Sequence, residues 1–125
     1  MKEVKGYIAG VEAKAAKAAE SKKLQMWAYH KRMVEVLTLA FRGARSRDAV
    51  VQRCVDLIRN AERSCPQIED PRLVADLWCV GVHARAILVV IGEHSYRPSL
   101  GWFRKLTGAP EKENDRWRGR VSDYF

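Results

Sequence analysis

The stretch that decides the fold is DPRLVADLWCVGVHARAILVVIG, residues 70–92. Asp70 is a good side-chain cap, Pro71 suits the first helical position, and Gly92 suits the position after a helix ends. Apolar residues between them recur every three or four positions, which predicts an α-helix. Apolar side chains also occupy its other faces, so we expect it to be the central helix of a bundle. Its main apolar face consists of Leu73, Leu77, Val80, Ala84, Ile87, Leu88 and Ile91.

The same stretch is the most apolar of the chain, but His83 and Arg85 interrupt it. Its apolar part is also shorter than the roughly 20 residues that a membrane span requires, so no membrane is expected. A charge among apolar side chains is costly unless it is paired. We therefore expect Arg85 to reach solvent or to meet Asp56, Glu62 or Asp76 on a neighbouring helix, with an anion site in a cleft as the alternative.

Upstream of this helix, the sequence predicts a second one over residues 48–64. Ser46 suits the N-cap position, and Pro66 ends the helix because proline cannot continue it. The expected apolar face of this helix consists of Val51, Cys54, Val55, Ile58 and Ala61.

The first segment, residues 2–43, keeps apolar residues at helical spacing almost throughout, and Lys22 is the one charge in this stripe. A continuous helix of this length would extend about 60 Å, whereas a compact domain of this size is about 36 Å across. The helix must therefore break near residues 21–23 and fold back, or its alanine-rich first half must project and pack on something else. A projecting half would pair with a second copy of the chain or with another protein through Val4, Ile8, Val11, Ala15 and Ala18.

Positive charge is concentrated at both ends of the chain, which has a net charge of +8 and a pI near 9.7. Residues 1–47 carry 11 basic and 4 acidic side chains, and residues 96–125 carry 7 and 4. Such asymmetry favours nucleic acid, an acidic protein face or an anionic membrane as the partner, with solubility of a small domain as the alternative reason for the charge. Residues 96–125 also interleave aromatic residues with arginines on what we predict to be short helices, a composition that suits base stacking or a protein interface. We expect the aromatic side chains to close the core and the arginines to form a solvent-facing contact surface. The predicted nucleic-acid contacts are Lys14, Lys17, Lys22, Lys23, Lys31, Arg104, Lys105, Arg116, Arg118 and Arg120.

Residue types that carry catalysis or bind metals form no recognisable motif. Cys79 and His83 lie four residues apart on one helix, but no second pair completes a zinc site, so we expect neither metal nor cofactor. Three cysteines, an odd number, and an N-terminal stretch unlike a signal peptide indicate free thiols in a reducing compartment, and hence a cytoplasmic protein. We do not expect an enzyme.

These patterns predict an all-α protein, with residues 1–125 forming a single helical domain. The expected architecture is a bundle of four to five helices with a long N-terminal helix or helix pair. The expected function is that of a non-enzymatic basic binding module that contacts nucleic acid or a nucleoprotein assembly. The alternative is a protein–protein adaptor or inhibitor that acts through its N-terminal helix. In this alternative the same helix can also join two copies of the chain as a homodimer.

Overall fold

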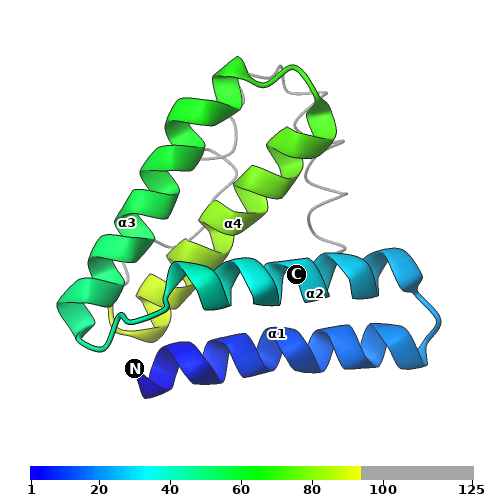
Figure 1. Cartoon of the computed structure of the whole chain (residues 1–125), viewed down its shortest axis with the longest axis horizontal. Helices are drawn as coiled ribbons and strands as arrows, with labels where there is room; N and C mark the ends of the chain where they lie inside the picture. The colour runs from blue at the N-terminus through cyan, green and yellow to red at the C-terminus, as the bar shows by residue number, and fades with distance from the viewer. Residues whose placement is uncertain (94–125) are drawn as a thin grey trace. The chain divides into compact units, whose positions relative to one another are not determined.

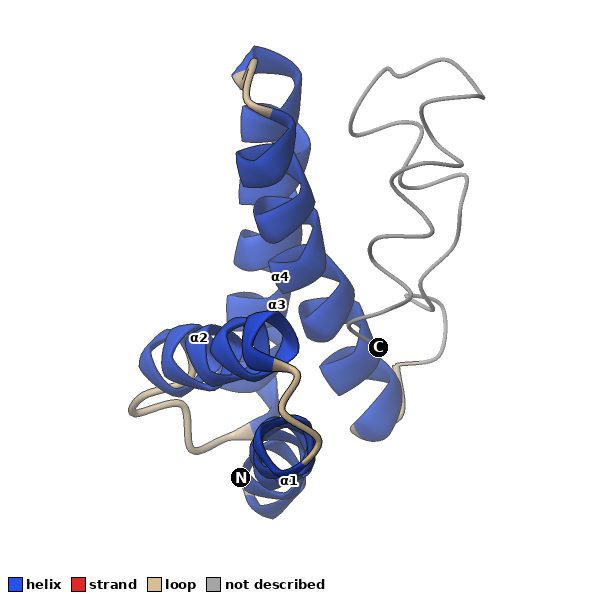
Figure 2. Cartoon of the chain, turned by 90° about the vertical axis from the view of Figure 1, so that its right-hand side faces the viewer, coloured by secondary structure: helices blue, strands red, loops and turns tan. Residues whose placement is uncertain are grey.

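The computed structural model describes residues 1–93, except for the side chains of Pro71 and Ala75. Over this range the chain forms four α-helices and one short 3-10 helix, and no strand (Figures 1 and 2). The elements are α1 (Lys2–Glu20), α2 (Leu24–Ala40), α3 (Arg47–Ser64), η1 (Cys65–Gln67) and α4 (Pro71–Val90). The predicted all-α class is therefore confirmed. The short helices predicted for residues 96–125 lie outside the described residues.

The described residues divide into two compact units, and the boundary between Arg53 and Cys54 falls inside α3. The first unit holds α1, α2 and the beginning of α3. The described part of the second unit holds the remainder of α3, η1 and α4. A single domain over the whole chain stays a prediction.

The first segment does break at residues 21–23, and α1 and α2 pack side by side as an antiparallel hairpin (Figure 1). Lys22 takes the left-handed conformation, with a φ of 57°. The Lys23 N–H donates to the Ala18 carbonyl at 2.9 Å, and the Lys22 N–H donates to the Ala19 carbonyl at 3.1 Å. This pattern is a Schellman motif, in which lysine occupies the position that glycine usually takes. Of the two arrangements left open by the sequence, the folded-back one is present.

The small side chains of α1 suit this close pairing. Val4, Val11, Ala15 and Ala18 are buried, and Ile8 is half-buried. They lie on the helix that packs against α2, whose own buried side chains include Tyr29, Met33 and Leu37. Alanine lets two helix backbones approach closely, which explains why so thin a stripe holds the hairpin together.

Local capping fixes the ends of α3 and α4 as the sequence predicted. The Ser46 hydroxyl accepts a hydrogen bond from the Ala49 N–H at 3.1 Å. The Asp70 carboxylate accepts one from the Arg72 N–H at 2.9 Å, directly before the first residue of α4. After α4, Gly92 has a φ of 100°, the left-handed conformation that favours glycine.

The middle of α4 is buried on every side, because all seven residues from position 78 to position 84 are buried. This burial agrees with the predicted role as a central helix. The predicted face is wrong in the first turn, however, since Leu73 is 55% exposed and Val74 is buried. The carbonyl of Val74 accepts a weak hydrogen bond from the Cys65 thiol at 4.0 Å, which places η1 against this part of α4.

The charge inside the apolar stretch is paired as expected, because Arg85 Nη2 lies 3.6 Å from Glu62 Oε1 on α3. The expectation that this stretch is too short to span a membrane is wrong, because α4 is the one described helix with the length and composition to cross one. Core helices of soluble proteins pass the same test. The burial of His83 and the ion pair of Arg85 are features of such a core helix.

Candidate functional site

The predicted lysine contacts that the structure describes all lie on the α1–α2 hairpin, and all are exposed. Lys14 and Lys17 lie on the second half of α1, Lys22 and Lys23 lie in the turn, and Lys31 lies on α2. These lysines are up to 17 positions apart in the sequence, and the folding back of α2 on α1 brings them together at the closed end of the hairpin. The other predicted contacts lie outside the described residues: Arg104, Lys105, Arg116, Arg118 and Arg120.

Lys14 of α1 acts electrostatically on His30 of α2. His30 of α2 is buried, and its pKa lies below the usual value. The main cause is burial, which disfavours the charged imidazolium, and the second is the positive charge of Lys14 on α1. Lys14 therefore lies near the face of α2 that carries His30.

An aromatic side chain lies between two of the lysines. Lys23, Trp27 and Lys31 are spaced by four residues at the start of α2, so they lie on one face of the helix. The Lys31 ammonium is 5.0 Å from the centre of the half-buried Trp27 ring, within cation–π distance. We call these three residues the lysine–tryptophan row. The row ends at Glu35, the next residue at this spacing.

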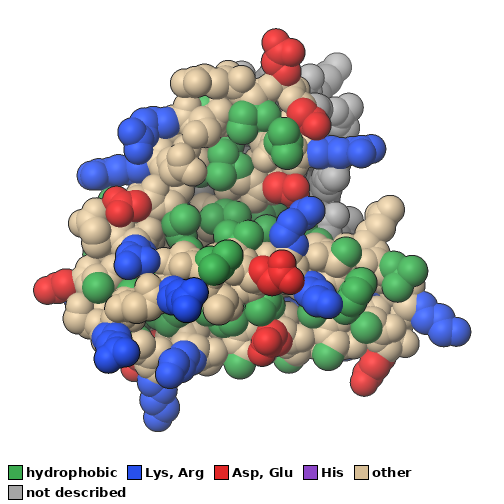
Figure 3. All heavy atoms as spheres, viewed as in Figure 1, with side chains coloured by type: hydrophobic (Ala, Val, Ile, Leu, Met, Phe, Trp, Pro, Cys, Tyr) green, Lys and Arg blue, Asp and Glu red, His purple; other side chains and the backbone are tan. Residues whose placement is uncertain are grey.

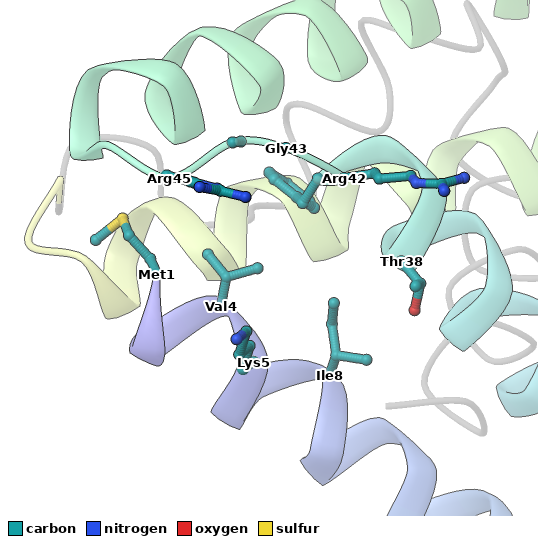
Figure 4. Close-up of a pocket in the computed structure, with 10 residues that line it drawn as sticks. Met1, Val4, Lys5, Ile8, Thr38, Arg42, Gly43 and Arg45 are labelled. Atoms are coloured by element: carbon teal, nitrogen blue, oxygen red, sulfur yellow. The ribbon is translucent and has the colours of Figure 1, made fainter.

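A second basic feature lies at the other end of the hairpin, where α1 begins and α2 ends (Figure 4). There a groove of about 500 Å³ separates the first turns of α1 from the turn between α2 and α3. In Figure 4, Val4 and Ile8 point from α1 towards this turn, which carries Arg42 and Arg45. We call it the open-end groove. Its lining consists of Met1, Val4, Lys5, Ile8, Thr38, Phe41, Arg42, Gly43, Ala44 and Arg45.

The turn that carries the two arginines is held by its own neighbours. Phe41 and Ala44 are buried, and the Ala44 N–H donates to the Phe41 carbonyl at 3.1 Å. Gly43 has a φ of 78°, a conformation that side-chain-bearing residues rarely adopt. Arg42 and Arg45 therefore stay exposed on either side of a fixed turn.

Positive charge in the open-end groove is not neutralised locally. Three of the ten described residues that line it are basic and none is acidic. Within residues 1–93, Lys5, Arg42 and Arg45 form no ion pair. On the face that Figure 3 shows, Lys and Arg side chains gather over this end of the hairpin.

Sequence reasoning missed the residues that the tertiary structure combines. Lys5 is far from Arg42 and Arg45 in the sequence, and only closure of the hairpin brings them to one groove. A local signal was present, since the segment FRGAR at residues 41–45 places glycine between two arginines directly after a predicted helix. Trp27 was missed as well, although it is half-buried and its ring contacts Lys31.

The predicted partner interface has a different environment. Four of its five residues, Val4, Val11, Ala15 and Ala18, are buried within the chain's own structure. The fifth, Ile8, lines the open-end groove. Pairing with another chain through this stripe stays a prediction, and it would require α1 to separate from α2.

The cysteine thiols of the described residues are poorly placed to act as nucleophiles. Cys54, Cys65 and Cys79 are free and buried. Burial raises the pKa of Cys54 to about 12 and that of Cys65 to about 11, so both remain protonated thiols at neutral pH. Residues 1–93 contain no group of three or more His, Cys, Asp or Glu side chains arranged to hold a metal ion.

Comparison of the chain with protein-family models, with curated proteins and with solved structures finds no match. Function must therefore be argued from the two basic features of the hairpin.

Proposed function

We propose that the chain is a non-enzymatic binding module whose first unit contacts nucleic acid, either free or within a nucleoprotein assembly. The observation that carries the proposal is the lysine–tryptophan row within a set of exposed lysines at the closed end of the hairpin. The charge balance of the first unit supports it, because residues 1–53 carry 12 basic and 5 acidic side chains.

The row can contact both parts of a nucleic-acid strand, its phosphates and its bases. Lys23 and Lys31 supply ammonium groups for phosphates, and Trp27 between them supplies a ring on which a base can stack. Lys14 and Lys17 on the neighbouring helix extend the positive surface. Contacts of this kind read the backbone rather than the sequence, so we expect affinity without strong base preference.

The direct test is fluorescence anisotropy with labelled single-stranded DNA, single-stranded RNA and duplex DNA at several salt concentrations. Each phosphate neutralised on a single strand steepens the log–log salt slope by about 0.7. A Lys23→Ala/Lys31→Ala variant should therefore bind more weakly and with a shallower slope. Trp27→Ala should weaken single-strand binding more than Trp27→Phe, because phenylalanine keeps an aromatic face.

Arg59→Ala/Arg63→Ala is the matched control, because it removes the same charge from exposed positions of the second unit. Absence of binding to all three polymers at micromolar protein and low salt would refute the proposal. Equal losses in the lysine variant and in the arginine control would show that net charge matters and that the row does not.

The alternative proposal is a protein adaptor or inhibitor that acts through α1. In this proposal α1 can also join two copies of the chain as a homodimer. Sedimentation equilibrium with Ile8→Glu tests it, because Ile8 is the member of the stripe that is only half-buried. A dimer that dissociates on this change without loss of helicity would favour the adaptor. A monomer at all concentrations would rule out the homodimer.

A further inference from the structure

The open-end groove differs from the lysine–tryptophan row in that it offers a cavity as well as charge. Its volume of about 500 Å³ lies within the range of roughly 300–1,000 Å³ that is typical of small-molecule sites. All of its lining comes from the first unit, residues 1–53. The groove therefore does not depend on how the two units are placed.

The cations of the groove come from two separate parts of the hairpin. Lys5 lies on α1, and Arg42 and Arg45 flank Gly43 in the turn after α2. A guanidinium group is planar and can donate two parallel hydrogen bonds to a phosphate, and an ammonium group adds a point charge. Since no acidic residue shares the described lining, a dianionic group is the complementary ligand.

The remaining walls of the groove are largely apolar. Val4 and Phe41 are buried, and half-buried Ile8 points towards the turn from the α1 side (Figure 4). Thr38 of α2 adds one polar group: its hydroxyl donates to the Val34 carbonyl at 2.7 Å, and its oxygen still has a lone pair to accept a hydrogen bond. An inorganic phosphate would satisfy the cations but would leave these walls unused.

We propose that the open-end groove binds a nucleotide, with its phosphate held by Lys5, Arg42 and Arg45 and its base against Val4 and Ile8. A base N–H or a ribose hydroxyl can donate to Thr38. The nucleotide is either a free nucleoside monophosphate or the phosphate-bearing end of a strand. In the second case the inference deepens the proposed function and rests on it, since the groove then holds the end of a strand that crosses the hairpin.

Nuclear magnetic resonance of the full chain tests the groove directly, with adenosine monophosphate, uridine monophosphate, inorganic phosphate and adenosine as separate titrants. We expect the two monophosphates to shift the amide signals of Ile8, Gly43 and Ala44 at lower concentration than phosphate or adenosine. Arg42→Ala/Arg45→Ala should weaken monophosphate binding roughly tenfold or more, because two charge-assisted contacts are lost. Arg59→Ala/Arg63→Ala, in the second unit, is the control and should leave monophosphate binding unchanged.

Two further titrants separate the sources of the nucleotide. A single-stranded oligonucleotide with a 5′-phosphate should bind more tightly than the same strand with a 5′-hydroxyl if the strand end occupies the groove. This difference should disappear in Arg42→Ala/Arg45→Ala. Equal affinity for the two strands, combined with monophosphate binding, assigns the groove to free nucleotides.

These experiments distinguish failure of this inference from failure of the proposed function. If neither monophosphates nor the 5′-phosphate strand use the groove, while strands still bind through the lysine–tryptophan row, the inference fails and the proposed function stands. If monophosphates bind but no strand does, the groove is a nucleotide site and the proposed function fails. Binding to vesicles with anionic lipid that depends on Arg42 and Arg45, without nucleotide binding, would overturn the inference. Circular dichroism of each variant checks that the fold is retained.

Discussion

His30 is a buried histidine whose surroundings oppose its protonation, first through burial and then through the charge of Lys14. In the unfolded chain this side chain takes up a proton near pH 6.5, and in the folded chain it does so only at lower pH. The unfolded state therefore binds more protons as the pH falls. The stability that His30 contributes is present above about pH 6.5 and is lost as the pH falls through its folded pKa.

The effect of Lys14 on the pKa of His30 gives a test of how α1 and α2 are aligned. Replacing Lys14 by Met removes the second cause of the shift, so the pKa of His30 should rise towards its usual value in a histidine titration by nuclear magnetic resonance. Lys17→Met is the control, since Lys17 is not among the causes of the shift. An unchanged His30 titration in Lys14→Met would contradict the close approach of Lys14 to His30.

Two glycines in the first unit should respond in opposite directions to replacement by alanine. Gly6 lies inside α1, and among the described residues no atom lies within 4 Å of where a Cβ would be added. Gly6→Ala should therefore raise the free energy of unfolding by roughly 0.5–1 kcal/mol. An added Cβ at Gly43 would also meet no atom within 4 Å, but the φ of Gly43 is 78°. Gly43→Ala should therefore lower the free energy of unfolding by roughly 1–2 kcal/mol.

Urea unfolding followed by circular dichroism measures both effects. Destabilisation by Gly6→Ala would mean that another part of the chain or a partner occupies the space beside α1. A neutral Gly43→Ala would mean that the turn can adopt another conformation, and Arg42 and Arg45 would then not be held in place.

The sequence predicted those elements whose ends depend on local chemistry. Ser46 and the pair of Asp70 and Pro71 cap their helices with their own side chains or ring geometry, so their roles are readable from neighbouring positions. Length alone left two arrangements of the first segment open, a break near residues 21–23 or a projecting first half. It did not decide between them, because an alanine stripe can pack equally well on its own chain or on another.

The candidate site was predictable only where it depends on local sequence. Exposure of Lys14 and Lys31 follows from their position off the apolar stripe. Grouping Lys5 with Arg42 and Arg45 requires the register of two helices, which is set by side-chain packing across the hairpin. Leu73 shows the same limit in the second unit, because helical spacing alone did not decide that Val74, and not Leu73, is buried in the first turn of α4.

At the scale of the whole molecule, α3 is the element that the two units share, since their boundary falls within it. A continuous helix couples the units, because unfolding one of them removes part of the helix from the other. We therefore expect a single cooperative unfolding transition. Leu37→Ala in the first unit and Ile87→Ala in the second should each shift this transition by roughly 2–5 kcal/mol, because both side chains are fully buried.

Urea unfolding followed by tryptophan fluorescence and by circular dichroism checks this expectation, and the two signals should coincide. Leu39→Ala is the control, because Leu39 is 67% exposed and its loss should cost less than about 0.5 kcal/mol. Two transitions, each sensitive to only one of the core substitutions, would show that the units are independent domains.

The three-residue turn at Ser21–Lys23 also has a kinetic consequence. The contacts between α1 and α2 nearest this turn join positions close in the sequence, and helical proteins rich in local contacts fold within microseconds to milliseconds. Synthesis runs from the N-terminus at about 5–20 residues per second, far more slowly than this. The hairpin can therefore close while the apolar residues of α4 are still inside the ribosome. A nascent chain would then display its lysine–tryptophan row and its open-end groove before its most apolar helix has emerged.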